Sequence, residues 1–172
     1  MAEREVWLRG PVDGVAPSLI PVAQALIQAK EDIQEMAKSI RQEELWIKPG
    51  GAASVGFHLL HAVGSLDRLF TYARGEPLTP AQFEAITQEK ELRPPLPDLP
   101  KLLAHATEAI DRAVLQLRRT PEASVGEARG VGRKLVPSTQ RDLVNHAAQH
   151  LFRHVGQVST TLKIIRGLNL SS

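Results

Sequence analysis

The sequence contains no cysteine among its 172 residues. This absence excludes disulfide bonds, thiolate zinc sites, iron–sulfur clusters and a cysteine nucleophile. A metal ion in this protein must therefore be held by nitrogen and oxygen ligands. Any thiol chemistry must use a thiol that is not part of the chain.

Aromatic residues, charge of one sign and long apolar runs are also scarce. Aromatics make up 4% of the chain and the formal net charge is +2, so a nucleic-acid-binding function is not expected. No apolar run reaches the roughly 18 residues that a membrane-spanning helix needs, and no membrane association is expected. The N-terminal segment 1–7 carries acidic residues and no apolar stretch. We therefore expect no secretory signal and predict a cytoplasmic location.

What is present is typical of a globular domain. Apolar residues make up 42% and charged residues 23% of the chain, and this length suffices to bury a sizeable core. We predict a single domain over residues 1–172.

Four long stretches carry apolar residues at helical spacing, separated by segments rich in proline and glycine. They span about residues 18–41, 54–74, 98–119 and 139–166. Apolar positions of the first stretch are Ile20, Ala23, Ile27, Ile33, Met36, Ala37 and Ile40. The pattern predicts an all-α fold, a four-helix bundle.

The joints between these stretches differ in length. The joint between the second and third helices is long, and Thr79 and Pro80 within it predict a short extra helix that reaches about Gln88. We therefore expect a crossover connection there rather than a tight hairpin. In the loop before the last helix, residues 134–136 can pair briefly as a strand.

Five of the six histidines lie in two short windows: His58 and His61, then His146, His150 and His154. Residues four apart on a helix lie one above the other, separated by about 6 Å of rise. Two such imidazoles and a third from a facing helix can converge on one ion, and three protein ligands leave a position open for water or substrate.

Each step of four residues drifts by about 40°, so His146 and His154 cannot aim equally well at one ion. We expect one of the three histidines His146, His150 and His154 to lie outside the ligand set. The alternative is a row of half-exposed polar side chains with no metal. His105 stands alone on its helix and is expected to be a hydrogen-bonded core or boundary residue.

Two segments resemble motifs of the DinB-like family. Residues 54–68, SVGFHLLHAVGSLDR, resemble the segment that opens the family's second helix with an apolar-x-x-x-His motif. Residues 146–157, HAAQHLFRHVGQ, resemble the fourth-helix motif of two histidines four apart followed by Gly-Gln. The resemblance covers nearly the whole chain. It implies a four-helix bundle, commonly a homodimer, in which three histidines bind a divalent metal, usually zinc or nickel.

By position, the resemblance implies that His61, His150 and His154 are the metal ligands. His58 and His146 are extra to the minimal pattern. They are expected to contact the ligands, to supply a fourth ligand, or to do neither. Gln157, one turn after His154, is expected to hydrogen-bond near the site, and the neighbouring Gly156 to permit a close approach to its helix.

Better-understood relatives use the metal to activate a low-molecular-weight thiol. The resemblance therefore implies a metal-dependent enzyme with a small-molecule substrate, and a thiol S-transferase as its reaction. Arg153 and Arg133 are candidates for binding a substrate carboxylate, with an ordinary surface position as the alternative.

Two other functions stay open. A metal-dependent hydrolase needs a general base. Asp67 and Asp142 lie about 9–12 Å along their helices from the nearest implied ligand, so Glu35 or Glu108 would have to serve. The second alternative is a non-catalytic metal-binding or stress-related bundle.

Overall fold

The computed structural model describes residues 4–170 as five α-helices and a small two-stranded sheet, with 68% of the described residues in α- or 3-10 helices. The all-α prediction is confirmed. Residues 1–3, the start of the N-terminal segment considered above, lie outside the described residues, as do residues 171 and 172. No helix in the described part is long and apolar enough to cross a membrane.

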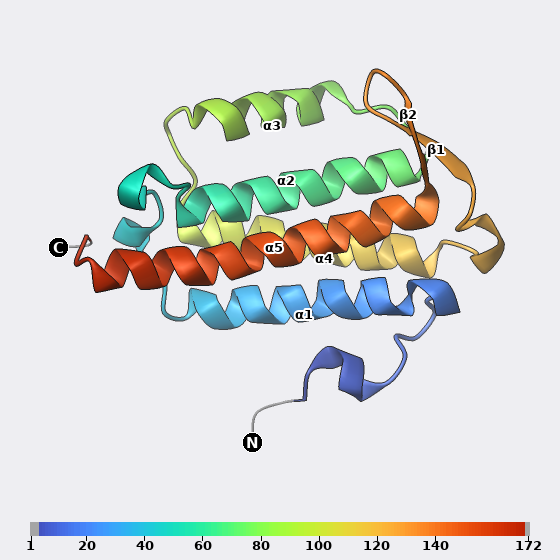
Figure 1. Ribbon diagram of the computed structural model, residues 1–172, viewed down its shortest axis with the longest axis horizontal. Coiled ribbons are helices and arrows are strands. Elements are labelled where there is room, and N and C mark those ends of the chain that lie inside the picture. The colour runs from blue at the N-terminus through green and yellow to red at the C-terminus, as the bar shows by residue number, and fades with distance from the viewer. Residues whose placement is uncertain (1–3, 171–172) are drawn as a thin grey trace.

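Four long helices form the bundle: α1 (Ile20–Ala37), α2 (Val55–Ala73), α4 (Leu99–Arg118) and α5 (Gln140–Gly167). Helix α2 packs against α5 and α4, and α1 packs against the same two helices, so α1 and α2 lie diagonally across the bundle. Helix α3 (Pro80–Glu91) lies outside the bundle along α2. It belongs to the long crossover, which returns the chain to the end at which α2 began (Figure 1).

Four of these helices begin where the sequence predicts them, because a side-chain oxygen caps each first turn. Ser54 accepts a hydrogen bond from the Phe57 N–H at 3.2 Å, and Thr79, Asp98 and Thr139 cap α3, α4 and α5 in the same way. Helix α3 runs to Glu91, three residues beyond its predicted end.

Helix α1 differs from its prediction in extent, and it buries apolar residues beyond the predicted ones. It ends at Ala37, after which the Arg41 N–H donates to the Glu44 carboxylate at 2.9 Å instead of continuing the helix. Of the predicted apolar residues, Ala23, Ile33 and Ile40 are buried, and Ile20, Ile27 and Met36 are partly buried against the core. Packing against α4 and α5 also buries Val22, Leu26 and Ala29, which the spacing did not single out.

The strand prediction at residues 134–136 was wrong in position. The strands are β1 (Ala128–Val131) and β2 (Val136–Thr139), paired antiparallel with Val131 opposite Val136. Gly132 at φ +68° and Leu135 at φ +49° place the turn at residues 132–135, so Lys134 and Leu135 belong to the turn. Short 3-10 turns lie at Val6–Arg9, Pro17–Leu19, Gln42–Glu44, Pro49–Gly51 and Glu122–Ser124.

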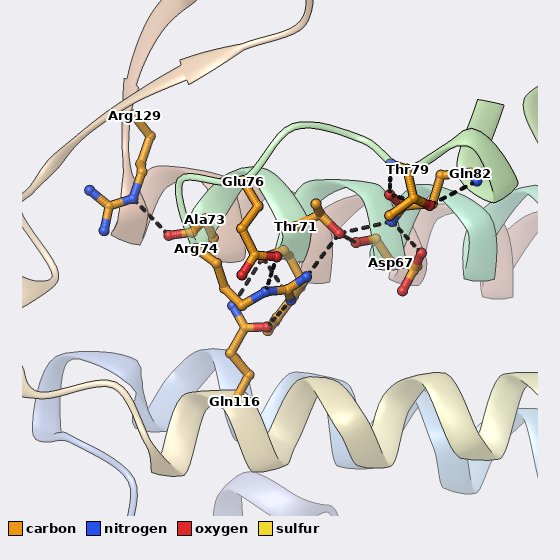
Figure 2. Close-up of polar contacts among 10 residues, drawn as sticks. Asp67, Thr71, Ala73, Arg74, Glu76, Thr79, Gln82, Gln116 and Arg129 are labelled. Atoms are coloured by element: carbon orange, nitrogen blue, oxygen red, sulfur yellow. Dashed lines mark hydrogen bonds and ion pairs between the residues drawn. The ribbon is translucent and has the colours of Figure 1, made fainter.

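Polar side chains close the C-terminal end of α2 and attach α3 to it (Figure 2). The Arg129 guanidinium donates to the Ala73 carbonyl at 2.8 Å, in the last turn, where the helix supplies no partner of its own. The Gln116 amide donates at 3.0 Å to the Phe70 carbonyl, which also accepts the Arg74 N–H. On the other side, the Gln82 amide of α3 donates to Asp67 at 2.6 Å and to Thr71 at 2.8 Å.

Candidate metal centre

Three histidines from the two helices with the closest packing meet at one point. His61 comes from the second turn of α2, and His150 and His154 from the middle of α5. One ring nitrogen from each lies within 4.8 Å of the others. Nε2 of His61 and Nε2 of His150 are 3.2 Å apart. His154 is buried, whereas His61 and His150 are half-buried, so the cluster is open on one side.

The donor set and its spacing fit a divalent transition metal. Imidazole nitrogens bind zinc at about 2.0–2.1 Å, which in tetrahedral geometry separates two ligand nitrogens by about 3.3 Å. The separation of 3.2 Å between the two Nε2 atoms matches this value. The three histidines therefore form a cluster that could hold a metal ion, with one pair of nitrogens already at the separation of two ligands.

Neighbouring side chains orient the His61 ring. Its Nδ1 lies 2.9 Å from Oε2 of Glu89, so Nε2 faces the other histidines. Phe57, one turn earlier on α2, stacks on the same ring with centroids 5.4 Å apart and planes 4° from parallel. A ring held on its edge and on one face has little freedom to turn away from the cluster.

Glu89 is itself held tightly. Its side chain is 6% exposed and pairs with the Arg68 guanidinium through two hydrogen bonds of 2.6 and 3.0 Å. Burial acts to raise the pKa of Glu89, but hydrogen bonds from His61 and Arg68 outweigh burial and hold it below its ordinary value. The carboxylate is therefore ionised at neutral pH.

His58, on α2, contacts His154 rather than the point where the three ligand nitrogens meet. The two Nδ1 atoms are 3.1 Å apart, so one of them donates a hydrogen bond to the other. When His154 uses Nδ1 in this contact, its Nε2 is free to act as a ligand. His58 contributes to the contacts around the cluster but is not among the three residues with mutually close ligand atoms.

The buried imidazoles are neutral. Burial, followed by the nearby charges of His150, His61, His58 and Arg153, lowers the pKa of His154 to about 3. Burial is also the leading cause that lowers the pKa of His150 and that of His58, with His61 the next contributor in both cases. Neutral imidazole is the form that binds a metal.

Several residues singled out from the sequence lie away from the cluster. His146 is exposed, with its ring centroid 6.0 Å from that of His150. Gln157 is exposed and its side chain forms no hydrogen bond with residues 4–170, so the expectation of a hydrogen bond near the site was wrong. Gly156 has no described atom within 4 Å of the position of a Cβ, so the expected close approach does not occur there. His105 is an exposed surface residue, not a core or boundary residue.

The carboxylate beside the histidines comes from an unexpected element. Glu35 and Glu108 are exposed; Glu35 pairs with Lys38, just after the end of α1, and Glu108 with Arg112 on α4. Glu89, which the sequence analysis did not single out, occupies the place beside His61. It lies just beyond the predicted end of the short helix, and α3 carries no apolar pattern that would place Glu89 on an inner face.

A four-helix bundle with a histidine cluster between two of its helices defines a class of helical protein able to bind a metal. Residues 21–158 match the family model of the DinB superfamily, and the chain belongs to this superfamily. The solved structure of a conserved protein from Enterococcus faecalis has a similar fold, with a TM-score of 0.65 and 16% sequence identity over 87% of this chain and 97% of that chain. No curated protein matches the chain.

Proposed function

We propose that this protein is a metal-dependent enzyme whose divalent ion, zinc or nickel, is held by His61, His150 and His154. The observation that carries the proposal is the convergence of three imidazole nitrogens from two facing helices within 4.8 Å. Three protein ligands leave a coordination position for an external molecule, which is the arrangement of catalytic rather than structural sites.

We propose a thiol S-transferase as the reaction, with a low-molecular-weight thiol as co-substrate. A divalent ion lowers the pKa of a bound thiol and so supplies thiolate at neutral pH. In a substitution, the bond between sulfur and an electrophilic carbon forms as the bond from that carbon to the leaving group breaks, and the thiol proton departs with the leaving group. In an addition to a conjugated acid, the carbon–carbon π bond breaks and the thiol proton passes to the neighbouring carbon. The chain has no cysteine of its own, in keeping with an external thiol.

The side chains around the cluster support this reaction. His61 and His150 are half-buried, so an external molecule can approach from solvent. Arg153 is exposed on α5 and its charge contributes to lowering the pKa of His150 and of His154, so it lies near enough to attract an anionic substrate. Arg133 instead lies over the Phe83 ring, 5.7 Å from its centroid.

Hydrolysis has weaker support. A hydrolase of this kind needs a carboxylate that is free to accept a proton from water. Glu89 is the acid in contact with the histidines, and both of its oxygens are already engaged by His61 and Arg68.

We further propose a homodimer in the cytoplasm acting on a small molecule.

Metal content tests the proposal most directly. We expect about one zinc or nickel per chain in untagged wild-type protein, and loss of that metal in His61→Ala and in His150→Ala. His105→Ala is the matched control, because His105 is an exposed histidine on α4. Conjugation of electrophiles with bacterial thiols is then assayed with the retained metal, and we expect it to stop in His150→Ala.

Two results would contradict the proposal at different levels. If wild-type protein takes up no zinc or nickel, the proposed metal site is wrong. Metal binding with no exchangeable water ligand and no thiol conjugation would keep the site and favour the non-catalytic bundle.

A further inference from the structure

We propose that Glu89 is the positioning residue of the metal centre, and that through Glu89 the docking of α3 and the binding of metal strengthen each other. The inference rests on the metal site proposed above. It assigns to the crossover helix a role that neither the histidine motifs nor the family match describes.

Helix α3 has few apolar contacts to hold it in place. Glu89 is its only buried residue, and Phe83 is 44% exposed. Two polar contacts attach the helix to α2: Gln82 to Asp67 and Thr71 near the first turn, and Glu89 to His61 and Arg68 near the last. Because the second contact is made to a proposed ligand, the position of α3 depends on the orientation of that imidazole.

The close approach of Glu89 requires a glycine on α2. A Cβ at Gly64 would lie 2.0 Å from Oε1 of Glu89 and 2.8 Å from Nη1 of Arg68. Since ordinary contacts begin near 3.4 Å, the carboxylate would have to move by more than about 1 Å. Gly64 lies three residues after His61, on the same side of the helix. The sequence therefore keeps a space open beside the ligand, and Glu89 fills it.

A carboxylate at Nδ1 fixes which nitrogen of His61 is free. With Nδ1–H donating to Glu89 at 2.9 Å, Nε2 is left unprotonated and directed at His150. Such a contact sets the tautomer and the ring direction of a metal-binding histidine and raises its basicity. The Nδ1–H becomes a stronger donor when Nε2 binds a cation, so metal binding strengthens the hydrogen bond that holds α3. By linkage, the docking of α3 must raise the affinity for metal by the same free energy.

The test compares four proteins. Glu89→Gln removes the charge with little change of shape, and Gly64→Ala displaces the carboxylate without altering any charged group. Glu84→Gln is the matched control, since Glu84 is an exposed acid of the same helix. Circular dichroism and a melting curve establish that each protein is folded.

We measure the Zn²⁺ dissociation constant by competition with a chromophoric chelator. Glu89→Gln and Gly64→Ala are expected to weaken binding by about 10–100-fold, the range for residues that support metal ligands, and Glu84→Gln is expected to match wild type. Amide hydrogen exchange of residues 82–91 should slow on addition of Zn²⁺ in wild type and not in Glu89→Gln. Wild-type affinity in both site variants would overturn the proposal while leaving the metal site intact.

A measurement without metal separates the two proposals. In the metal-free protein at pH 8, nitrogen NMR should show His61 protonated at Nδ1 in wild type and mixed between tautomers in the two site variants. Wild-type protein that binds no zinc but keeps this pattern would overturn the metal site and leave Glu89 as the residue that orients His61. An unchanged tautomer in both variants would overturn the positioning role.

Discussion

At the scale of single residues, histidine burial has a measurable consequence for stability. The pKa of His154 in the folded protein is about 3, against roughly 6.5 in an unfolded chain. Below pH 6.5 the unfolded state binds a proton that the folded state does not, so the free energy of unfolding falls as pH decreases toward 3.

We therefore expect the metal-free protein to lose stability between pH 7 and pH 5. The slope is at most about 1.4 kcal/mol per pH unit for each buried histidine. Urea unfolding at several pH values measures it, and His154→Gln should show a smaller slope than His105→Gln, whose histidine is exposed. Equal slopes in the two variants would contradict the assignment.

Replacing either of two glycines on the long helices by alanine is expected to change the free energy of unfolding, in opposite directions at the two positions. A Cβ at Gly56 would lie 2.8 Å from the Trp46 ring, whereas no described atom lies within 4 Å of one at Gly156. We expect Gly56→Ala to lower the free energy of unfolding by about 1–3 kcal/mol through overpacking. Gly156→Ala should raise it by about 0.5–1 kcal/mol because alanine is the better helix former. Chemical denaturation measures both, and a destabilised Gly156→Ala would show that this face of α5 is covered.

At the scale of elements, one buried carboxylate joins the connection between α1 and α2 to the C-terminal end of α5. Glu44, with no exposed surface, accepts two hydrogen bonds from the Arg166 guanidinium near the end of α5, at 2.8 and 2.9 Å. It accepts two more from Arg41, one from the guanidinium at 3.1 Å and one from the backbone N–H at 2.9 Å. The hydrogen bond from Arg166 is the main reason that the pKa of Glu44 falls to about 2. This contact fixes the segment between α1 and α2, and with it the start of the helix that carries His61.

We expect Glu44→Gln to destabilise the protein by about 1–3 kcal/mol, since it leaves a buried polar group partly unsatisfied. Glu43→Gln is the control, because Glu43 is exposed and lies 3.5 Å from Arg41. The ionised Glu44 carboxylate contributes its full stabilisation to the free energy of unfolding above about pH 4.5, the pKa of this group in the unfolded chain. This stabilisation is lost as pH falls toward 2, the pKa in the folded protein. The difference between the two variants should therefore disappear near pH 2, and a difference that persists there would contradict this account.

At the scale of the whole molecule, the buried faces of all four long helices belong to one apolar cluster. We propose that residues 1–172 form one domain and expect a single cooperative unfolding transition. Coincident curves from circular dichroism and from tryptophan fluorescence, which reports on half-buried Trp46 and exposed Trp7, would support it. Two separate transitions would contradict it. Sedimentation velocity tests the proposed homodimer.

Much of this architecture could be predicted from local chemistry. Ser54, Asp98 and Thr139 cap helices that begin where the sequence places them, because a cap acts on the turn that follows it. The proposed ligands could be found for the same reason: His150 and His154 share a face by helical spacing alone. His61 joined them through the resemblance, and its convergence with them required only that α2 and α5 be neighbours.

Local sequence patterns were enough to place the helices, to exclude sulfur ligands and to pair His150 with His154 on α5. Packing between distant segments sets how deeply Val22, Leu26 and Ala29 of α1 are buried, where the hairpin turns and which acid lies beside His61. These depend on contacts between segments far apart in the chain. Glu89 and His61 are separated by 28 residues. No local helix propensity indicates that the polar helix α3 packs on α2 with the Glu89 side chain in the space beside Gly64.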